Sequence, residues 1–175
     1  MYHNVITVFN FHEKTGAWYT TVFKGVNLVE HKADVSTQDA GVTNTDTIEA
    51  IIRVKQDKSV HTIIYEPYRI LDNEGNNIVS EDHSKLSYLD PDTDELRKYI
   101  GPKAYARLDN PVGYFTFKAE QDFIVEGNYS SDLPIDDGKY DEGLYHAMND
   151  AQDGVYMITS AVFYSLLPHF EIGGR

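Results

Sequence analysis

The sequence has no cysteine and few basic residues, and each shortage excludes a class of protein. Without cysteine the chain can form no disulfide, no cysteine-based zinc or iron–sulfur site and no cysteine nucleophile. Lysine and arginine together number 15, against 28 aspartate and glutamate residues, so the formal net charge is −13. Proteins that bind nucleic acid or anionic membranes need a basic surface. We therefore expect neither nucleic acid nor a membrane as a partner.

Long hydrophobic runs are also missing. The longest apolar stretch is far shorter than the ~18 residues that a membrane-spanning helix requires. Residues 1–7 lack the basic region and the apolar region of a secretory signal. The sequence therefore predicts a protein that stays in the cytoplasm unless an assembly carries it elsewhere.

The chain does contain many aromatic and β-branched residues in period-two patterns. Its 175 residues fit one domain with its own core. Residues 47–55 alternate between apolar and polar side chains, which is typical of a half-buried strand. Residues 5–9 and 17–26 are predicted to form two more strands, and the polar, glycine-containing segment 12–16 suits a turn between them.

Further strands are predicted in the rest of the chain. Residues 60–65 are expected to pair with 47–55, and residues 114–117 to form a hairpin with 123–125. The last long strand spans residues 154–167. Both of its faces are fairly apolar, so we expect it in a central or covered position.

One helix is predicted, and two further short segments are candidates for a helical turn or helix. Asp92 and Glu95 have the spacing of a capping box, and Leu96, Tyr99 and Ile100 follow at helical spacing, so a helix is expected over 92–100. A second helical turn is expected to start at Pro102. Residues 142–149 are the other candidate for a helix.

These elements together predict a mainly β fold. We expect a small antiparallel barrel or sandwich with one or two short helices, in a single domain that spans residues 1–175. Long loops are expected at about 32–46, 72–93 and 128–143, and a short C-terminal tail at 168–175.

Three aspartates, Asp90, Asp92 and Asp94, have the spacing of the first ligands of a helix–loop–helix calcium site. The rest of that pattern fails, because Glu95 stands where glycine is needed and Gly101 where a bidentate glutamate is needed. We therefore interpret these acids as the start of the predicted helix, where they complement its dipole.

Other candidate chemistry is equally weak. The acidic residues between 132 and 142 are interpreted as a solvated loop. The seven histidines form no local metal-binding motif, and the chain has no nucleophile elbow, P-loop or dinucleotide-binding motif. The sequence thus predicts no catalytic residue, no metal ligand, no cofactor and no enzymatic activity.

Aromatic side chains leave two interpretations open. Most are expected in the core, including Phe9, Phe23 and Phe117. Trp18 and Tyr114 are expected on the opposite faces of their strands, where they could contact a sugar or a protein.

Six short segments together resemble a known family. They lie at residues 4–10, 21–26, 46–52, 123–127, 158–161 and 169–175, the last reading His-Phe-Glu-Ile-Gly-Gly-Arg. Their order is similar to that in uncharacterised proteins of bacteriophages and prophages of gut Firmicutes, which are found among genes for virion structural proteins. In that family the last residues read much like H-[WF]-E-[VI]-G-G-[KR]. Residues 72–110 and 130–150 look less like the family.

The resemblance implies a minor structural protein of the head–tail connector or tail. Its expected partners are other virion proteins, namely capsid, connector or tail subunits, and it is expected to form a ring of identical copies. It is expected in the cytoplasm of the bacterial host during assembly and then in the virion. Candidate assembly contacts lie in the C-terminal tail, at Phe170, Ile172 and Arg175. The alternatives are a carbohydrate- or protein-binding module with exposed aromatic residues and, less favoured, a divergent hydrolase.

Overall fold

The structure, a computed structural model, describes residues 4–32, 46–56 and 86–175. Over these residues the chain is mainly β, with two α-helices, α1 (Pro102–Tyr105) and α2 (Leu144–Ala151), and a 3-10 turn, η2 (Asp137–Lys139). The strands are β1 (Asn4–His12), β2 (Ala17–His31), β3 (Thr47–Arg53), β4 (Lys55–Gln56), β5 (Leu86–Leu89), β6 (Leu96–Tyr99), β7 (Tyr114–Phe115), β8 (Phe123–Glu126), β9 (Ile135–Asp136), β10 (Val155–Tyr164) and β11 (His169–Gly174).

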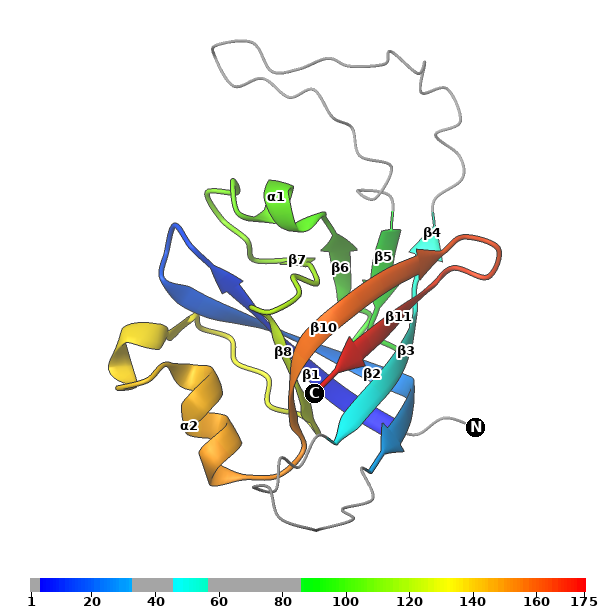
Figure 1. Cartoon of the computed structure of the whole chain (residues 1–175). Coiled ribbons are helices and arrows are strands. Elements are labelled where there is room, and N and C mark those ends of the chain that lie inside the picture. Colours follow the sequence, from blue (N-terminus) through cyan, green and yellow to red (C-terminus); the bar gives the residue numbers. More distant parts are fainter. Residues whose placement is uncertain (1–3, 33–45, 57–85) are drawn as a thin grey trace.

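Six strands close into an antiparallel barrel in the order β1, β8, β10, β11, β3, β2, and β2 pairs back onto β1. Because β2 is long, it pairs with two strands in succession. Its residues 17–26 pair with β1, and its residues 27–31 pair with β3. Figure 1 shows the ring, with the β10–β11 hairpin crossing in front of it. The prediction of a mainly β fold is confirmed. Of the two expected architectures, a barrel or a sandwich, the structure is a barrel.

The β1–β2 hairpin follows the sequence closely. Segment 12–16 makes the expected turn, in which Gly16 takes a φ of +63° that suits glycine. Farther along β2, the register with β1 shifts and Gly25 has a φ of +68°, as in a β-bulge. Beside this irregularity the backbone N–H of Lys24 donates to the Tyr88 hydroxyl at 2.8 Å. This hydrogen bond ties β5 to the barrel.

One hydrophobic core joins the barrel interior to a second sheet of four short strands, in the order β4, β5, β6, β7. Val8 on β1 points inward and is fully buried, as the period-two pattern predicts. Aromatic rings from the second sheet meet the inward residues of the barrel. The ring centroids of Phe23 and Phe115 lie 5.1 Å apart, and those of Tyr99 and Phe170 lie 4.6 Å apart. The second sheet therefore completes the barrel core with aromatic side chains.

A second hydrophobic cluster covers the outside of the barrel beneath α2. Phe9 points outward from β1 and stacks on Phe123 of β8, with ring centroids 4.6 Å apart. Leu144 of α2 packs in the same cluster, and Trp18 meets Phe123 edge-on. Both faces of β8 are therefore covered, which explains why Phe123, Ile124 and Val125 are all fully buried.

The structure confirms several expected elements. β3 lies within the strand expected at 47–55, and β10 lies within the strand expected at 154–167. α1 begins at Pro102, as expected, and α2 covers most of the segment 142–149. No helix in the described ranges is long and apolar enough to cross a membrane.

The helix predicted over 92–100 is wrong, because this segment is a hairpin turn followed by β6. Asp94 has a φ of +57°, and the backbone N–H of Asp90 donates to the carbonyl oxygen of Glu95 at 2.9 Å. This hydrogen bond closes the loop between β5 and β6. Tyr99 is buried but Leu96 is exposed, so the apolar residues do not form the single stripe that a helix would bury.

The hairpin predicted between 114–117 and 123–125 is also wrong. β7 pairs in parallel with β6, while β8 pairs with β1 and β10. The residues between them make a tight turn, in which the Asp122 side chain accepts a hydrogen bond from the backbone N–H of Lys118 at 2.8 Å. Phe117, next to this turn, is buried in the core. The alternation at 114–117 therefore reflects burial and not pairing with 123–125.

The C-terminal segment expected as a docking tail is strand β11 of the barrel. It pairs with β10 on one side and β3 on the other, and Phe170 and Ile172 are buried in the core. The two glycines of this segment allow close packing. A Cβ at Gly173 would lie 2.6 Å from the Ser160 hydroxyl, and one at Gly174 would lie 3.1 Å from Ile48.

Some expectations fall outside the described residues. These are the strand at 60–65, its pairing with 47–55, and most of the loops expected at 32–46 and 72–93. Within the described part of the last of these, residues 86–89 are strand β5. The loop expected at 128–143 contains β9 and η2, joined by irregular backbone.

Candidate functional site

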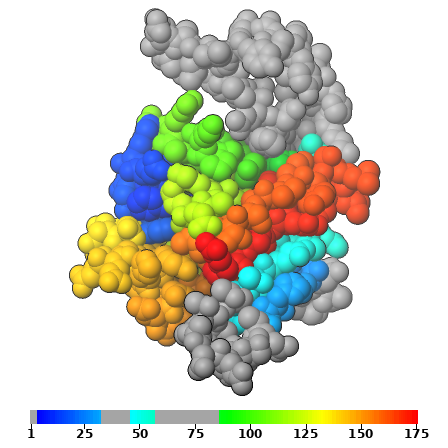
Figure 2. Space-filling view, in the orientation of Figure 1, coloured from blue at the N-terminus to red at the C-terminus, as the bar shows by residue number. Residues whose placement is uncertain are grey.

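The β10–β11 hairpin carries four exposed apolar side chains, including Leu166, the most exposed large apolar side chain of the described residues. Leu166 and Leu167 in its turn are 91% and 75% exposed, and Val162 and Tyr164 on β10 are 49% and 44% exposed. We call these four residues the hairpin surface. Figure 1 shows the turn of the hairpin reaching out beyond the barrel, and Figure 2 shows the hairpin running across the face of the molecule. Contiguous exposed apolar side chains mark interaction sites in proteins.

The same hairpin has an open backbone edge. β10 pairs with β8 over Val155–Met157, and Ile158 then exchanges backbone hydrogen bonds with Glu120 and Asp122. From residue 159 to residue 164, β10 pairs with β11 on one side, and no other described strand lies on its opposite side. An open edge with apolar side chains is a template for strand addition.

The hairpin is also the longest part of the chain without charge. No aspartate, glutamate, lysine or arginine occurs between Asp153 and Glu171. On the outer face, the ring of Tyr164 stacks on that of His169, with centroids 5.0 Å apart. The neighbouring Glu171 carboxylate raises the pKa of Tyr164 by charge repulsion and by a hydrogen bond to the phenol. The charge nearest to Tyr164 on β11 is thus the Glu171 carboxylate, and one strand farther in, Arg53 of β3 lies opposite His169.

A cleft of about 770 Å³ opens where the ends of β2, β8 and β10 meet α2 and the C-terminus. Acidic and basic side chains both line it, among them Glu126, Asp153 and Arg175. The Tyr156 hydroxyl donates to Glu126 Oε1 at 3.2 Å, and burial together with this carboxylate raises the pKa of Tyr156 to about 12. This tyrosine therefore keeps its proton and orients Glu126. Of the three candidate assembly contacts, Arg175 alone is exposed, and it reaches Glu120 at 3.3 Å.

The polar end of the barrel holds a buried carboxyl that the sequence reasoning missed. Asp122 accepts hydrogen bonds from the Asn10 side chain at 2.9 Å and from the backbone N–H groups of Phe11 and Lys118 at 3.1 and 2.8 Å. Burial raises the pKa of Asp122 to about 7, although all three donors favour its charged form. The group therefore titrates near neutral pH inside the fold.

Other polar groups are buried in the same part of the molecule. His12 is two residues after Asn10 on β1, and its ring meets that of Tyr105 edge-on with centroids 5.6 Å apart. His12 Nε2, the Tyr105 hydroxyl and the Thr116 hydroxyl are buried without a hydrogen-bond partner in the structure. Burial also raises the pKa of Tyr105. A signal existed in the sequence, since Asn10 and His12 continue the inward-facing series of Ile6 and Val8 on β1.

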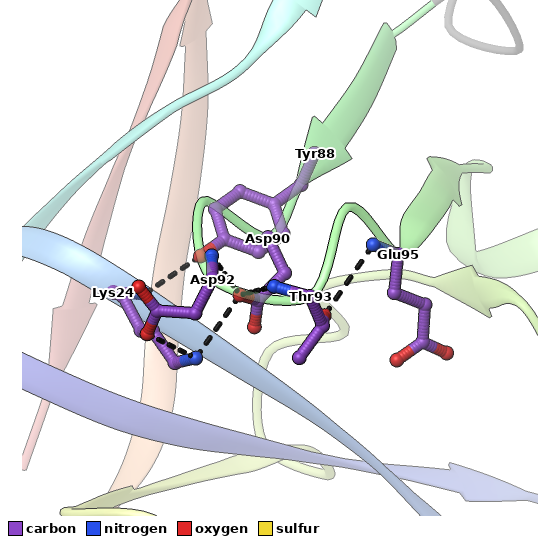
Figure 3. A network of polar contacts seen from close by, with 6 residues as sticks. All are labelled: Lys24, Tyr88, Asp90, Asp92, Thr93 and Glu95. Atoms are coloured by element: carbon purple, nitrogen blue, oxygen red, sulfur yellow. Dashed lines mark hydrogen bonds and ion pairs between the residues drawn. The ribbon is translucent and has the colours of Figure 1, made fainter.

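Two of the three aspartates that resembled a calcium loop, Asp90 and Asp92, form a salt-bridged turn with Lys24 (Figure 3). Lys24 Nζ lies 3.0 Å from Asp90 Oδ1 and 2.8 Å from Asp92 Oδ2, which raises its pKa. Burial acts to raise the pKa of Asp90, but the backbone N–H groups of Asp92 and Thr93 and the Lys24 ammonium outweigh it and lower that pKa. These acids therefore cap a hairpin turn, not a helix. Among the described residues, no three potential metal ligands cluster.

The second acidic segment is more structural than expected. Asp137 Oδ1 accepts from Trp18 Nε1 at 2.6 Å and from the backbone N–H of Leu144 at 2.8 Å. It thereby joins β2 to the start of α2. Trp18 is only 6% exposed, so the expectation that it lies on an open binding face is wrong. A sugar-binding surface therefore lacks the tryptophan on which that interpretation depended.

The structure thus brings one predicted contact, Arg175, to the surface and places Phe170 and Ile172 in the core. The hairpin surface was not among the predicted contacts, although the uncharged run from 154 to 170 is visible in the sequence. Comparisons with protein-family models, with curated proteins and with solved structures each gave no match.

Proposed function

We propose that this protein is a non-enzymatic structural component of a bacteriophage or prophage virion that acts by protein–protein assembly. The observation that carries the proposal is the hairpin surface, where Leu166 and Leu167 project from the barrel almost fully exposed. Their burial against another protein removes apolar area from water, which is the main favourable term in association. The barrel itself, closed around six strands, supplies a rigid support for that contact.

The resemblance of the six sequence segments to phage proteins gives the proposal its setting. On this resemblance we propose that the protein acts at the head–tail connector or in the tail, with capsid, connector or tail subunits as partners. The protein is then made in the cytoplasm of the bacterial host and carried into the virion. Strand addition at an open edge, of the kind that β10 offers, is a common way for β proteins to join neighbours.

Deletion of the gene in a phage that carries it tests the proposal. Heads and tails are expected to form but not to join, and the chain is expected in purified wild-type particles by mass spectrometry. Complementation should depend on the hairpin surface, so a Leu166→Lys, Leu167→Lys double variant fails. The control is Leu133→Lys, which places one lysine at an exposed leucine away from the hairpin. Infectious particles of normal appearance that lack the chain would contradict the proposal.

A further inference from the structure

We propose that a second copy of this chain pairs with β10, antiparallel and edge to edge, across residues 160–164. The pairing deepens the assembly function proposed above and rests on it for its biological role. It joins two barrels through one continuous sheet, and it is symmetric, because each copy offers the same strand to the other.

The first support is the backbone of β10. Beyond Ile158 this strand has β11 as its one neighbour among the described strands. Alternate N–H and C=O groups of a strand point to opposite sides, so half of those between residues 159 and 164 point away from β11. Ser160, Ala161, Val162 and Tyr164 are exposed, so another strand can reach this edge. On the β8 side, the hydrogen bonds of Ile158 to Glu120 and Asp122 mark where the open edge begins.

The second support is charge, which favours a copy of the same chain over a partner of opposite sign. Each copy carries a net charge of −13, so two copies repel wherever their charged surfaces face each other. Residues 159–164 of β10 include no charged residue. The nearest acids are Glu171, opposite Val162 on β11, and Glu120, whose backbone N–H donates to Ile158 where the open edge begins and whose carboxylate pairs with Arg175. Two acidic copies can therefore pair along residues 160–164 without placing like charges opposite each other on the paired strands. A basic partner finds no acid among these residues to bind.

The third support is the match of side chains in the symmetric register. When the two-fold axis passes beside Val162, this residue faces its own counterpart and Ser160 faces Tyr164 of the other copy. β-branched and aromatic residues form favourable cross-strand pairs. Leu166 and Leu167 then extend beyond the paired residues and pack on the second barrel. The hairpin surface becomes buried as one patch.

Sedimentation velocity of the full chain from about 1 to about 500 µM tests the self-association. The wild type is expected to shift from monomer to dimer over this range. A Val162→Lys variant places two ammonium groups opposite each other and should weaken the dimer at least about tenfold, with an unchanged circular dichroism spectrum. The Leu133→Lys control should dimerise as the wild type does. A wild type that remains monomeric, or a dimer that Val162→Lys leaves intact, overturns the proposal.

The absence of native cysteine allows a second test that does not depend on destabilising the dimer. A Val162→Cys variant is expected to form a disulfide-linked dimer under mild oxidation, because directly opposed Cα atoms lie about 4.5–5.5 Å apart. A Ser160→Cys variant faces Tyr164 of the other copy and should not cross-link. Equal cross-linking of both variants overturns the register. A chain that is present in virions but monomeric overturns only the self-pairing, whereas a dimer that is missing from virions overturns only the proposed function.

Discussion

Individual polar side chains hold together the end of the barrel where Asn10 and His12 replace aliphatic residues inside β1. Asp122 is the centre of this group, since it fixes the backbone of Phe11 and of Lys118 in addition to the Asn10 amide. Removing a buried acceptor leaves its donors without partners, which costs about 1–3 kcal/mol for each group. The side chain therefore acts as a cross-link between β1 and the turn before β8.

The raised pKa of Asp122 predicts that stability falls as pH rises towards neutrality. In the folded state the carboxyl has a pKa of about 7 against 3.8 when exposed, so between these values the folded chain binds the proton more tightly. The stabilising contribution is therefore complete below pH 3.8 and is lost as pH rises through about 7, with a slope of about 1.4 kcal/mol per pH unit.

Urea unfolding of the wild type and of Asp122→Asn at several pH values between about 5 and 8 measures this slope. The variant is expected to be less stable at every pH, because its amide NH₂ faces a hydrogen-bond donor, and to lack this part of the pH dependence. Asp109→Asn is the control, since the Asp109 side chain is fully exposed. A carboxyl that titrates below pH 5 in carbon-13 NMR spectra would contradict the prediction.

The position of a single residue can be predicted from the sequence where its residue type strongly favours one environment. Gly16 was correctly placed in a turn, and most phenylalanines were correctly placed in the core. It fails for residues whose role depends on a distant partner. Asp137 belongs to an acidic segment that resembles a solvated loop, and nothing nearby in the sequence shows that it binds Trp18.

Elements defined by period two were predictable, and short elements at turns were not. The apolar alternation of 47–55 identifies β3 because one face of that strand is buried along its whole length. The residues at 92–100 are compatible with a helix pattern and with a hairpin. The hairpin has partners outside the segment, because β6 pairs with β5 and Lys24 of β2 pairs with Asp90 and Asp92. Tertiary contacts of this kind override local propensity.

β11 was expected as a C-terminal tail, but the structure places it as a strand inside the barrel wall. A chain that ends at Pro168 loses the strand between β10 and β3, and with it the buried rings and aliphatic groups of Phe170 and Ile172. Because an open barrel exposes two strand edges and part of its core, we expect no cooperative thermal unfolding transition by circular dichroism.

The matched control for this truncation is Arg175→Ala. It removes an exposed side chain but keeps the two backbone hydrogen bonds between residue 175 and Met157, at 2.8 and 3.0 Å. Its melting temperature should stay close to that of the wild type, as expected for a surface ion pair. A chain ending at Pro168 that melts like the full chain would show that the barrel does not need β11.

At the scale of the whole molecule, the acidic net charge is combined with an uncharged edge on the projecting hairpin. Six strands close the barrel, and among the described strands the outer part of β10, which carries no charge, has a neighbour on one side only. The net charge of −13 was readable from the sequence, and it correctly described a highly charged surface. The uncharged run was equally readable, but its meaning depended on the fold, because only the structure shows that the run forms a projecting hairpin and not a buried strand.

This arrangement predicts that added salt strengthens the proposed dimer. Two copies repel through their net charges, while the paired edge is uncharged, and the screening length falls from about 30 Å at 0.01 M salt to about 8 Å at 0.15 M. The dissociation constant measured by sedimentation should therefore decrease as sodium chloride is raised over this range. A dimer held by ion pairs would show the reverse.

Salt can strengthen the dimer by screening the repulsion between the two copies or by strengthening apolar contacts. A variant that removes a charge beside the β10 edge separates these two effects. Glu171 lies opposite Val162 on β11, and Glu49 lies one strand farther in, opposite Gly173. A Glu171→Gln variant lowers the repulsion between copies, and its amide oxygen can still accept the hydrogen bond from the Tyr164 phenol. We expect it to dimerise more tightly than the wild type at low salt and to depend less on salt. If its dissociation constant matches that of the wild type at every salt concentration, repulsion at this face does not limit association, and the uncharged edge loses its proposed advantage.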